Sequence, residues 1–243
     1  MRFPATTLFL AFALLAADIA APSAANGAGL TGAPVRVGSM SFIQDGLHNC
    51  GTVAMLLSWA KTRPQEAAEL VRREENGSYR VMFTGESVVV TPTDLAAARK
   101  ARVVTTAKDD DWARVVLTGF IKLKSGSGRL KFKVTDWIYA GEIAERLSDS
   151  PTWSSALKNE SVDRHGRIRV GRPISTAAIK SELNSLRGKP MVAYSNRRIH
   201  IWAVMAYDPK HGRVLMRNPR QQNSAWMTAK EFGQKFELIV YSF

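Results

Sequence analysis

The sequence contains one cysteine, and its position would allow the thiol to act as a nucleophile. Cys50 comes six positions after Gln44, and a run of apolar residues begins at Val53. Asn49 is a residue type that caps helices, so the pattern predicts a buried helix that begins at Cys50. The unpaired backbone N–H groups in the first turn of a helix stabilise a thiolate. Cys50 is therefore a candidate nucleophile, and the alternative is a buried, unreactive thiol.

Gln44 is placed to assist such a nucleophile. Gly46 favours a bend between Gln44 and Cys50, which brings the side-chain amide of Gln44 toward the backbone N–H of Cys50. Two N–H donors beside a thiolate form an oxyanion hole. The alternative is that Gln44 is a surface loop residue in front of a helix that only serves the core.

A thiol nucleophile needs a base, and the chain contains four histidines. His165 and His211 lie in sequences that are typical of solvated turns. His48 lies in the loop before the predicted helix and is expected to point in another direction. His200 begins an apolar run that is typical of a strand, so it is the candidate base.

The strand that begins at His200 also predicts an orienting residue. It is expected to form a β-hairpin with residues 213–217, turning about Pro209-Lys210. That register places His200 opposite Asn218 or the proline after it, within roughly 5 Å at Cβ. Asp208 lies farther along the strand, on the order of 26 Å from His200. Asn218 is therefore expected to orient the imidazole; the alternative for His200 is a half-buried histidine bonded to the backbone.

The hydrophobic pattern along the rest of the chain predicts an α+β domain. Helices are expected at 50–61, 64–74, 112–122, 136–146 and 174–186, and strands at 78–83, 88–91, 191–194, 200–207, 213–217 and 236–243. Ser125–Gly128 has the composition of a flexible connector and marks a possible subdomain seam. A nucleophile helix then lies between a helical half and an antiparallel β half, and substrate is expected to bind in the cleft between them.

The first residues have the features of a targeting segment. Arg2 precedes a short apolar stretch, and the small residues up to Ala25 suit a signal-peptidase site before Asn26. Residues 1–25 are therefore expected to be removed, leaving 26–243 as one domain. No later stretch approaches the ~18 consecutive apolar residues of a membrane span. The protein is expected to be exported, to the periplasm or beyond the cell.

Composition narrows the choice of partners. The chain has 34 Lys and Arg against 21 Asp and Glu, a formal net charge of +13. Such a surplus favours acidic partner surfaces, but the basic residues are scattered without a nucleic-acid-binding motif, so specific nucleic-acid binding is not expected. One cysteine excludes a disulfide-stapled scaffold and a multi-cysteine zinc or iron–sulfur site.

Gln44, Cys50, His200 and Asn218 resemble, in this chain order, the catalytic set of the papain-like cysteine peptidases, and among them the calpain catalytic core. Residues 44–50 are similar to the calpain motif with the oxyanion glutamine and the nucleophile. Residues 214–219 are similar to the strand that ends in the catalytic asparagine. Weaker similarity is found at 76–83, 88–90 and 111–117. The resemblance spans about residues 41–222, and its two ends are the specific parts.

The resemblance implies a papain-like fold and hydrolysis of peptide bonds in a protein or peptide substrate. It implies that Cys50 attacks the carbonyl carbon, that His200 is the base and then the acid, that Gln44 holds the oxyanion and that Asn218 orients the imidazole. No metal or organic cofactor is required for this chemistry. Calpains are regulated by calcium, but their acidic calcium loops have no match here, so calcium is left unassigned.

Two positions depart from the calpain pattern. Gly51 and Arg220 stand where calpains usually carry tryptophans, and the second of these tryptophans shields the asparagine–histidine contact from water. Two other functions stay open. A transglutaminase-like acyl transferase uses the same thiol and imidazole, although it usually orients the histidine with an aspartate. A catalytically degenerate binding module of the same fold would use the cleft and the basic surface to bind acidic partners.

Overall fold

The structure is a computed structural model of the 243-residue chain. Contacts divide the chain into Met1–Leu30 and Thr31–Phe243, and the second unit is the one described below. The residues that the structure describes are 33–35, 37, 40–106, 111–126, 130–132, 140–148, 151–162, 168–195 and 200–242. The expected signal peptide and residues 127–128 of the expected seam lie outside them.

The fold is mixed α+β with antiparallel sheets, which confirms the fold class at that coarse level. The helices are α1 (Cys50–Thr62), α2 (Pro64–Glu69), α3 (Pro92–Lys100), α4 (Trp112–Ser125), α5 (Ala140–Ser148), α6 (Thr176–Ser185) and α7 (Ala229–Lys235). The first strands are β1 (Ala33–Pro34), β2 (Ile43–Gln44), β3 (Val71–Arg73), β4 (Tyr79–Phe83), β5 (Glu86–Val90), β6 (Val104–Thr105) and β7 (Thr152–Ala156). The others are β8 (Lys158–Val162), β9 (Ile168–Pro173), β10 (Met191–Ser195), β11 (His200–Asp208), β12 (Arg213–Arg217), β13 (Ser224–Thr228) and β14 (Leu238–Ser242).

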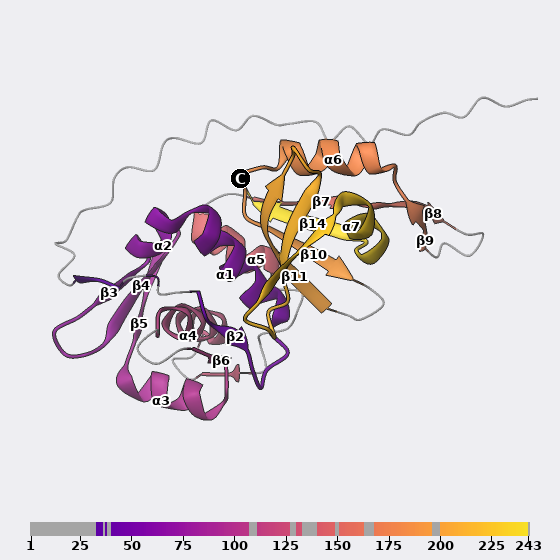
Figure 1. The fold of residues 1–243 in the computed structure, drawn as a ribbon. Coiled ribbons are helices and arrows are strands. Elements are labelled where there is room, and N and C mark those ends of the chain that lie inside the picture. Colours follow the sequence, from indigo (N-terminus) through magenta and orange to yellow (C-terminus); the bar gives the residue numbers. More distant parts are fainter. Residues whose placement is uncertain are drawn as a thin grey trace, which may run out of the picture. The chain divides into compact units, whose positions relative to one another are not determined.

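A six-stranded antiparallel sheet carries the C-terminal half of the chain, in the order β13-β12-β11-β10-β14-β7 (Figure 1). Its side chains alternate between two hydrophobic cores, as the twofold period of a strand requires. Ile201, Ala203 and Met205 of β11 join the core that contains α1, α4 and α5, whereas Val204 joins the core of α6 and α7. The sheet therefore separates two apolar layers, and β11 contacts both.

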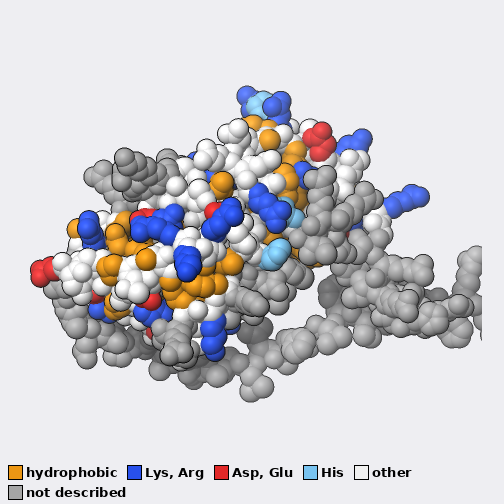
Figure 2. All heavy atoms as spheres, turned by 90° about the horizontal axis from the view of Figure 1, so that it is seen from below, with side chains coloured by type: hydrophobic (Ala, Val, Ile, Leu, Met, Phe, Trp, Pro, Cys, Tyr) orange, Lys and Arg blue, Asp and Glu red, His pale blue; other side chains and the backbone are white. Residues whose placement is uncertain are grey.

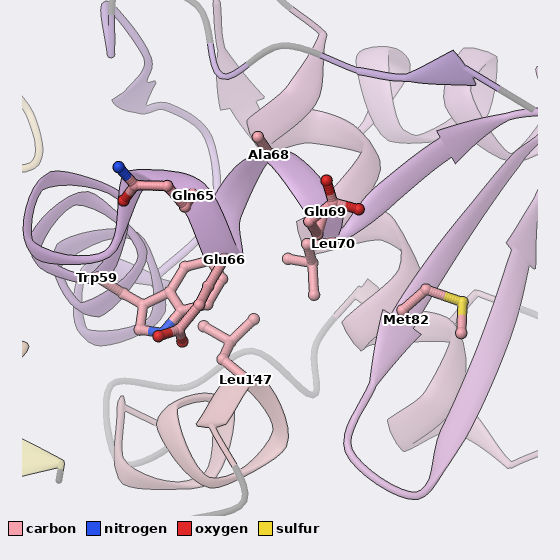
Figure 3. A pocket seen from close by; sticks show the side chains of 8 residues that line it. All are labelled: Trp59, Gln65, Glu66, Ala68, Glu69, Leu70, Met82 and Leu147. Atoms are coloured by element: carbon pink, nitrogen blue, oxygen red, sulfur yellow. The ribbon is translucent and has the colours of Figure 1, made fainter. Parts of the chain in front are cut away.

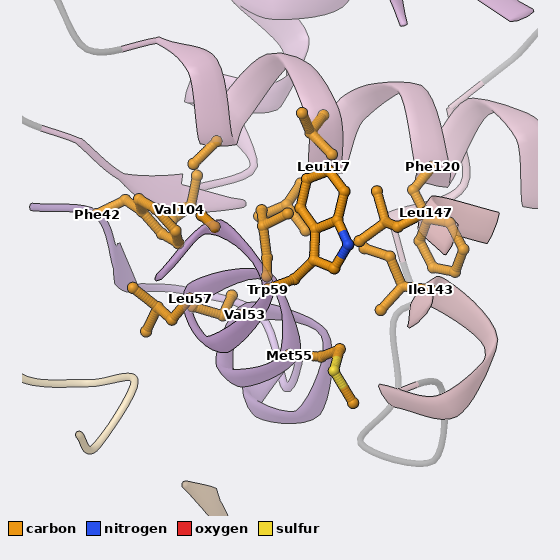
Figure 4. Packing of buried hydrophobic residues seen from close by; sticks show 14 of the residues in the cluster. Phe42, Val53, Met55, Leu57, Trp59, Val104, Leu117, Phe120, Ile143 and Leu147 are labelled. Atoms are coloured by element: carbon orange, nitrogen blue, oxygen red, sulfur yellow. The ribbon is translucent and has the colours of Figure 1, made fainter. Parts of the chain in front are cut away.

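Helix α1 is buried from Cys50 to Ala60, as expected for a helix that is apolar on nearly every side. Figure 4 shows the indole of Trp59 packed among side chains of α4 and α5, including Leu117 and Ile143. Ser58 fixes the helix to the sheet, because its hydroxyl donates to Val204 O (2.8 Å) and accepts from Met191 N (2.7 Å). These contacts set the position of the helix start, where Cys50 lies.

Several sequence-predicted boundaries need correction. The helix predicted at 64–74 ends at Glu69, because the β-branched Val71 begins β3, which pairs with β4 instead of extending the helix. The helices predicted at 136–146 and 174–186 are Ala140–Ser148 and Thr176–Ser185, and residues 136–139 lie outside the described part. The strand predicted at 236–243 is Leu238–Ser242.

The hairpin predicted after the first two helices is confirmed. Strands β4 and β5 pair from Tyr79 with Val90 to Phe83 with Glu86, and Thr84-Gly85 forms the turn. Gly85 has a φ of 75°, a backbone conformation that glycine adopts without strain. Within the described residues, the structure contains no helix long and apolar enough to span a bilayer.

Asp94 connects helices α3 and α4, so a substitution there measures how much this connection stabilises the fold. It completes a capping box with Thr91 at the start of α3 and accepts a bond from Lys122 Nζ of α4 at 2.7 Å. Burial raises the pKa of Asp94, but the hydrogen bonds from Lys122 and Thr91, together with the charge of Lys122, outweigh burial. The pKa of this carboxyl therefore lies below its ordinary value.

We expect Asp94→Asn to lower the free energy of unfolding by about 1–2 kcal/mol at neutral pH, since it weakens a cap and removes an ion pair. A carboxyl with a lowered folded-state pKa stabilises the fold above its unfolded value of about 3.9, and this contribution is lost as the pH falls through the folded value. Urea unfolding at neutral pH and in acid measures the difference. It should shrink in acid; an equal difference at both pH values would contradict the assignment.

The matched control for that experiment is Glu66→Gln. Glu66 forms an i,i+3 ion pair with Arg63 at 3.0 Å, and half of the Glu66 side chain is exposed. Exposed pairs of this kind contribute about 0–1 kcal/mol. The control should therefore change stability less than Asp94→Asn does.

Candidate active site

Cys50 lies at the first residue of α1 and is only 5% exposed. Asn49 is the residue before the helix, as predicted, but its side chain does not cap it. Its Nδ2 instead donates to Val103 O at 2.8 Å, because the side chain is fully buried and this carbonyl is within reach. Asn49 therefore fixes the helix start to the segment after α3.

The environment of the Cys50 thiol contains opposing effects. Burial raises its pKa, whereas the backbone N–H groups of Ile201 and Gly51 and the positive charge of Arg220 lower it; burial is the larger effect. The helix start thus favours the thiolate as predicted, but it does not by itself outweigh desolvation. The pKa of the Cys50 thiol therefore lies above its ordinary value, and a neighbouring base that takes its proton would favour the thiolate.

His200 and Asn218 are in direct contact. His200 Nε2 lies 2.8 Å from Asn218 Oδ1, and that oxygen also accepts a bond from Arg220 N at 3.0 Å. Because a backbone N–H points at the same Asn218 atom, that atom is the oxygen, and the hydrogen lies on His200 Nε2. Asn218 therefore fixes one tautomer of His200, in which Nδ1 is the basic nitrogen.

The predicted hairpin register was wrong, although the predicted contact is present. β11 and β12 close with Asp208 opposite Arg213, around a four-residue connection, and a bulge between Val204 and Ala206 shifts the pairing again. The last pair is Ala203 with Arg217. Asn218 is therefore not directly opposite His200. The two side chains meet diagonally across the end of the hairpin, which long polar side chains can span.

Asp208 lies at the other end of β11, as the sequence predicted. Its Oδ2 is 2.6 Å from Nδ1 of His211, and its Oδ1 accepts from the backbone N–H of Lys210 at 3.0 Å. It holds the β11–β12 turn, at the opposite end of β11 from His200. His48 and His211 are both exposed, and His165 lies outside the described residues.

Gln44 is buried beside the loop that follows β12. Its backbone N–H donates to Pro219 O at 2.6 Å, and its side-chain Oε1 accepts from Arg220 Nε at 3.3 Å. Its Nε2 donates to Leu47 O at 2.7 Å. The bend after Gln44 therefore turns the amide toward Leu47, whereas the sequence predicted an approach to the N–H of Cys50. An amide carries a second N–H, which can donate elsewhere.

Arg217 holds the Gln44 segment in place, a role that the sequence analysis did not assign. Its side chain is 4% exposed, and its guanidinium donates to the carbonyl oxygens of Met40, Phe42 and Gln221. Burial lowers the pKa of Arg217. A charged residue at the end of an apolar strand was a signal, but Met40 and Phe42, which supply two of the three carbonyls, are 177 and 175 residues away in sequence.

Two further residues lie around the thiol and imidazole. Tyr194 of β10 pairs with Ile201; burial raises its pKa, and so do the charges of Glu237 and Cys50. Trp202 presents its ring edge-on to His200, with 6.4 Å between the ring centroids. Trp202 shows that the imidazole has an aromatic neighbour even though position 220 is an arginine. Nothing in the motif around Cys50 pointed to either residue.

One hollow in the described part of the chain lies away from these residues. It has a volume of about 560 Å³ and lies between α2, β4 and the end of α5; its lining is Trp59, Gln65, Glu66, Ala68, Glu69, Leu70, Met82 and Leu147 (Figure 3). The buried indole N–H of Trp59 has no hydrogen-bond partner among the described residues. None of the four candidate site residues lines this pocket, so it does not contribute to the chemistry of Cys50.

Surface charge and metal ligands add two observations. Lys and Arg side chains are spread over the face seen in Figure 2, with hydrophobic and polar ones between them. Within the described ranges, no group of three or more His, Cys, Asp or Glu side chains could hold a metal ion.

No protein-family model matches the chain, and no curated protein is similar to it in sequence.

Proposed function

We propose that the protein is an exported cysteine peptidase with a single papain-like catalytic domain. The observation that carries the proposal is the bond between His200 Nε2 and Asn218 Oδ1, which holds the imidazole at the start of β11, where the Ile201 N–H faces the Cys50 thiol. A nucleophile at a helix start, a base beside it and a residue that orients the base are the parts that nucleophilic catalysis needs. The nucleophile helix packs on an antiparallel sheet, as in a papain-like fold.

The proposed reaction begins with proton transfer from Cys50 Sγ to His200 Nδ1. The thiolate then attacks the carbonyl carbon of the scissile peptide bond, and the carbonyl oxygen takes the negative charge. The backbone N–H of Cys50 and the second N–H of Gln44 are proposed to hold that oxygen. His200 gives its proton to the leaving amine, which leaves a thioester on Cys50; water, deprotonated by His200, then releases the acid.

The raised pKa of Cys50 is compatible with this order of events. A buried thiol stays neutral until His200 takes its proton, and the N–H groups of Ile201 and Gly51 then stabilise the thiolate. The same observation favours a second candidate, a degenerate binding module whose thiol is never ionised. A transglutaminase-like acyl transferase gains less support, because the side chain that contacts His200 Nε2 is an asparagine.

Alkylation of the purified protein separates the peptidase from the binding module. Cys50 is the only cysteine, so intact mass after iodoacetamide treatment reports this residue alone. The peptidase proposal expects rapid labelling at neutral pH that blocks peptide hydrolysis. Labelling that appears only above about pH 9, as for an ordinary buried thiol, supports the binding module. Incorporation of a primary amine into a glutamine donor would identify the acyl transferase.

The remaining parts of the proposal concern location and partners. Export with removal of residues 1–25 gives a mature chain that begins at or near Asn26, and N-terminal sequencing of the exported form tests this; an intact Met1 there contradicts it. The substrate is a protein or peptide, and the charge of +13 favours acidic partner surfaces. The proposed chemistry uses no metal or organic cofactor.

A further inference from the structure

Arg220 has an unusual place in the candidate site. It follows Asn218 and Pro219 in the loop after β12, and its backbone N–H donates to Asn218 Oδ1 at 3.0 Å. Its side-chain Nε donates to Gln44 Oε1 at 3.3 Å. One residue therefore contacts both the group that orients the imidazole and the proposed oxyanion donor.

No carboxylate among the described residues neutralises the charge of Arg220. In the part of the chain that the structure describes, Arg220 forms no ion pair, and the residue is exposed. The acidic residue next to Gln44, Asp45, is paired with Arg102 and also accepts from Thr105. The Nε–Gln44 bond anchors the guanidinium at one corner, which leaves its two terminal amino groups in a geometry that matches a carboxylate.

The bonds to Gln44 and to Asn218, which itself contacts His200, place Arg220 at the candidate site, and its positive charge also acts on the Cys50 thiol. A carboxylate held by Arg220 would therefore be near the atom that attacks the substrate. We propose that Arg220 forms a carboxylate subsite beside Cys50, so that the preferred substrates carry a carboxylate next to the bond that is cleaved. This inference rests on the proposed function and adds a substrate class to it.

The test compares two alkylating reagents that differ in charge. Iodoacetate and iodoacetamide both react with the Cys50 thiolate and release iodide, but iodoacetate carries a carboxylate and iodoacetamide a neutral amide. The ratio of their second-order rate constants cancels any change in the thiolate population, so it reports recognition of the carboxylate alone. We expect Arg220→Gln to lower the ratio of iodoacetate to iodoacetamide rates by on the order of tenfold.

Two further variants serve as controls for charge and for guanidinium geometry. Arg213→Gln removes the same charge from an exposed position on β12, at the turn end of the strand, and should change the ratio less than about twofold because solvent screens it. Arg220→Lys keeps the charge without the two-pronged geometry and should give an intermediate ratio. An unchanged ratio in Arg220→Gln, or an equal fall in Arg213→Gln, would overturn the subsite.

The outcome also separates this inference from the proposed function. If iodoacetamide labels Cys50 rapidly at neutral pH but the ratio does not depend on Arg220, the subsite is wrong and the peptidase proposal stands. If neither reagent labels Cys50 at neutral pH, the peptidase proposal fails first.

Substrate peptides then identify the source of the carboxylate. One set places Asp, Glu, Asn or Gln next to the scissile bond in peptides with blocked ends, and a second set has a free or amidated C-terminus. A higher kcat/KM for the acidic side chains indicates an internal acidic site, and a preference for the free C-terminus indicates a carboxypeptidase. No preference in either set, or one that Arg220→Gln leaves unchanged, contradicts the proposed substrate class.

Discussion

Cys50→Ser is expected to abolish peptide hydrolysis while leaving the fold intact. The exchange of sulfur for oxygen changes the size of the side chain little, and the site is buried, so the core around α1 should keep its packing. A hydroxyl is far less acidic than a thiol, and His200 is not expected to ionise it in a desolvated position. We expect kcat/KM to fall by roughly 10⁴-fold or more, as for other removals of a nucleophile.

The measurement needs a control for folding. Thermal melting curves of Cys50→Ser and Cys50→Ala, monitored by circular dichroism, should show that both variants are folded. Hydrolysis should be absent from both. A folded Cys50→Ser that retains wild-type turnover would place the nucleophile elsewhere and remove the basis of the site assignment.

The second large effect is expected at His200. Substitution by alanine should reduce activity most at His200, less at Asn218 and least at Asp208. His200→Ala removes the proton acceptor and should cost nearly as much as the loss of Cys50. Asn218→Ala removes the group that holds the tautomer, and should lower kcat by one to two orders of magnitude, about 1.4–2.8 kcal/mol. Asp208→Ala, at the far turn, should leave kcat/KM near the wild-type value.

The ranking has a direct physical basis in the structure. Asn218 Oδ1 is 2.8 Å from His200 Nε2, whereas Asp208 is bonded to His211. Asn218→Asp should retain more activity than Asn218→Ala, because a carboxylate oxygen can also accept the Nε2 hydrogen. Steady-state kinetics of the four variants checks the order. A greater loss in Asp208→Ala than in Asn218→Ala would mean that another residue orients His200.

The candidate site could be predicted from the sequence only where a local pattern located its parts. The helix start at Cys50 followed from a polar residue before an apolar run, and the start of β11 at His200 from a strand next to a turn. The register between β11 and β12 could not be predicted, because it depends on the length of the turn and on the bulge near Met205. The predicted contact between His200 and Asn218 is nevertheless present, because the two side chains meet diagonally across the end of the hairpin.

Other features that the sequence analysis did not predict have identifiable physical causes. Helices α3 and α7 each begin with a capping box, at Thr91-Asp94 and Thr228-Glu231, and this local signal could have found them. The shortening of the helix after Pro64 could not be found in this way, because pairing with β4 decides it. The role of Arg217 likewise depends on carbonyls from the other end of the chain.

The guanidinium of Arg217 has a consequence for the time at which the site can form. It binds Met40 and Phe42, at sequence separations of 177 and 175 residues, and the Gln44 N–H binds Pro219. During synthesis, Cys50 therefore leaves the ribosome long before the residues that complete its surroundings. A nascent chain or a prematurely terminated fragment that ends before β12 contains the thiol but neither Asn218 nor Arg217. Such a fragment should be inert, because the proposed site requires synthesis to continue through Arg217 and Asn218.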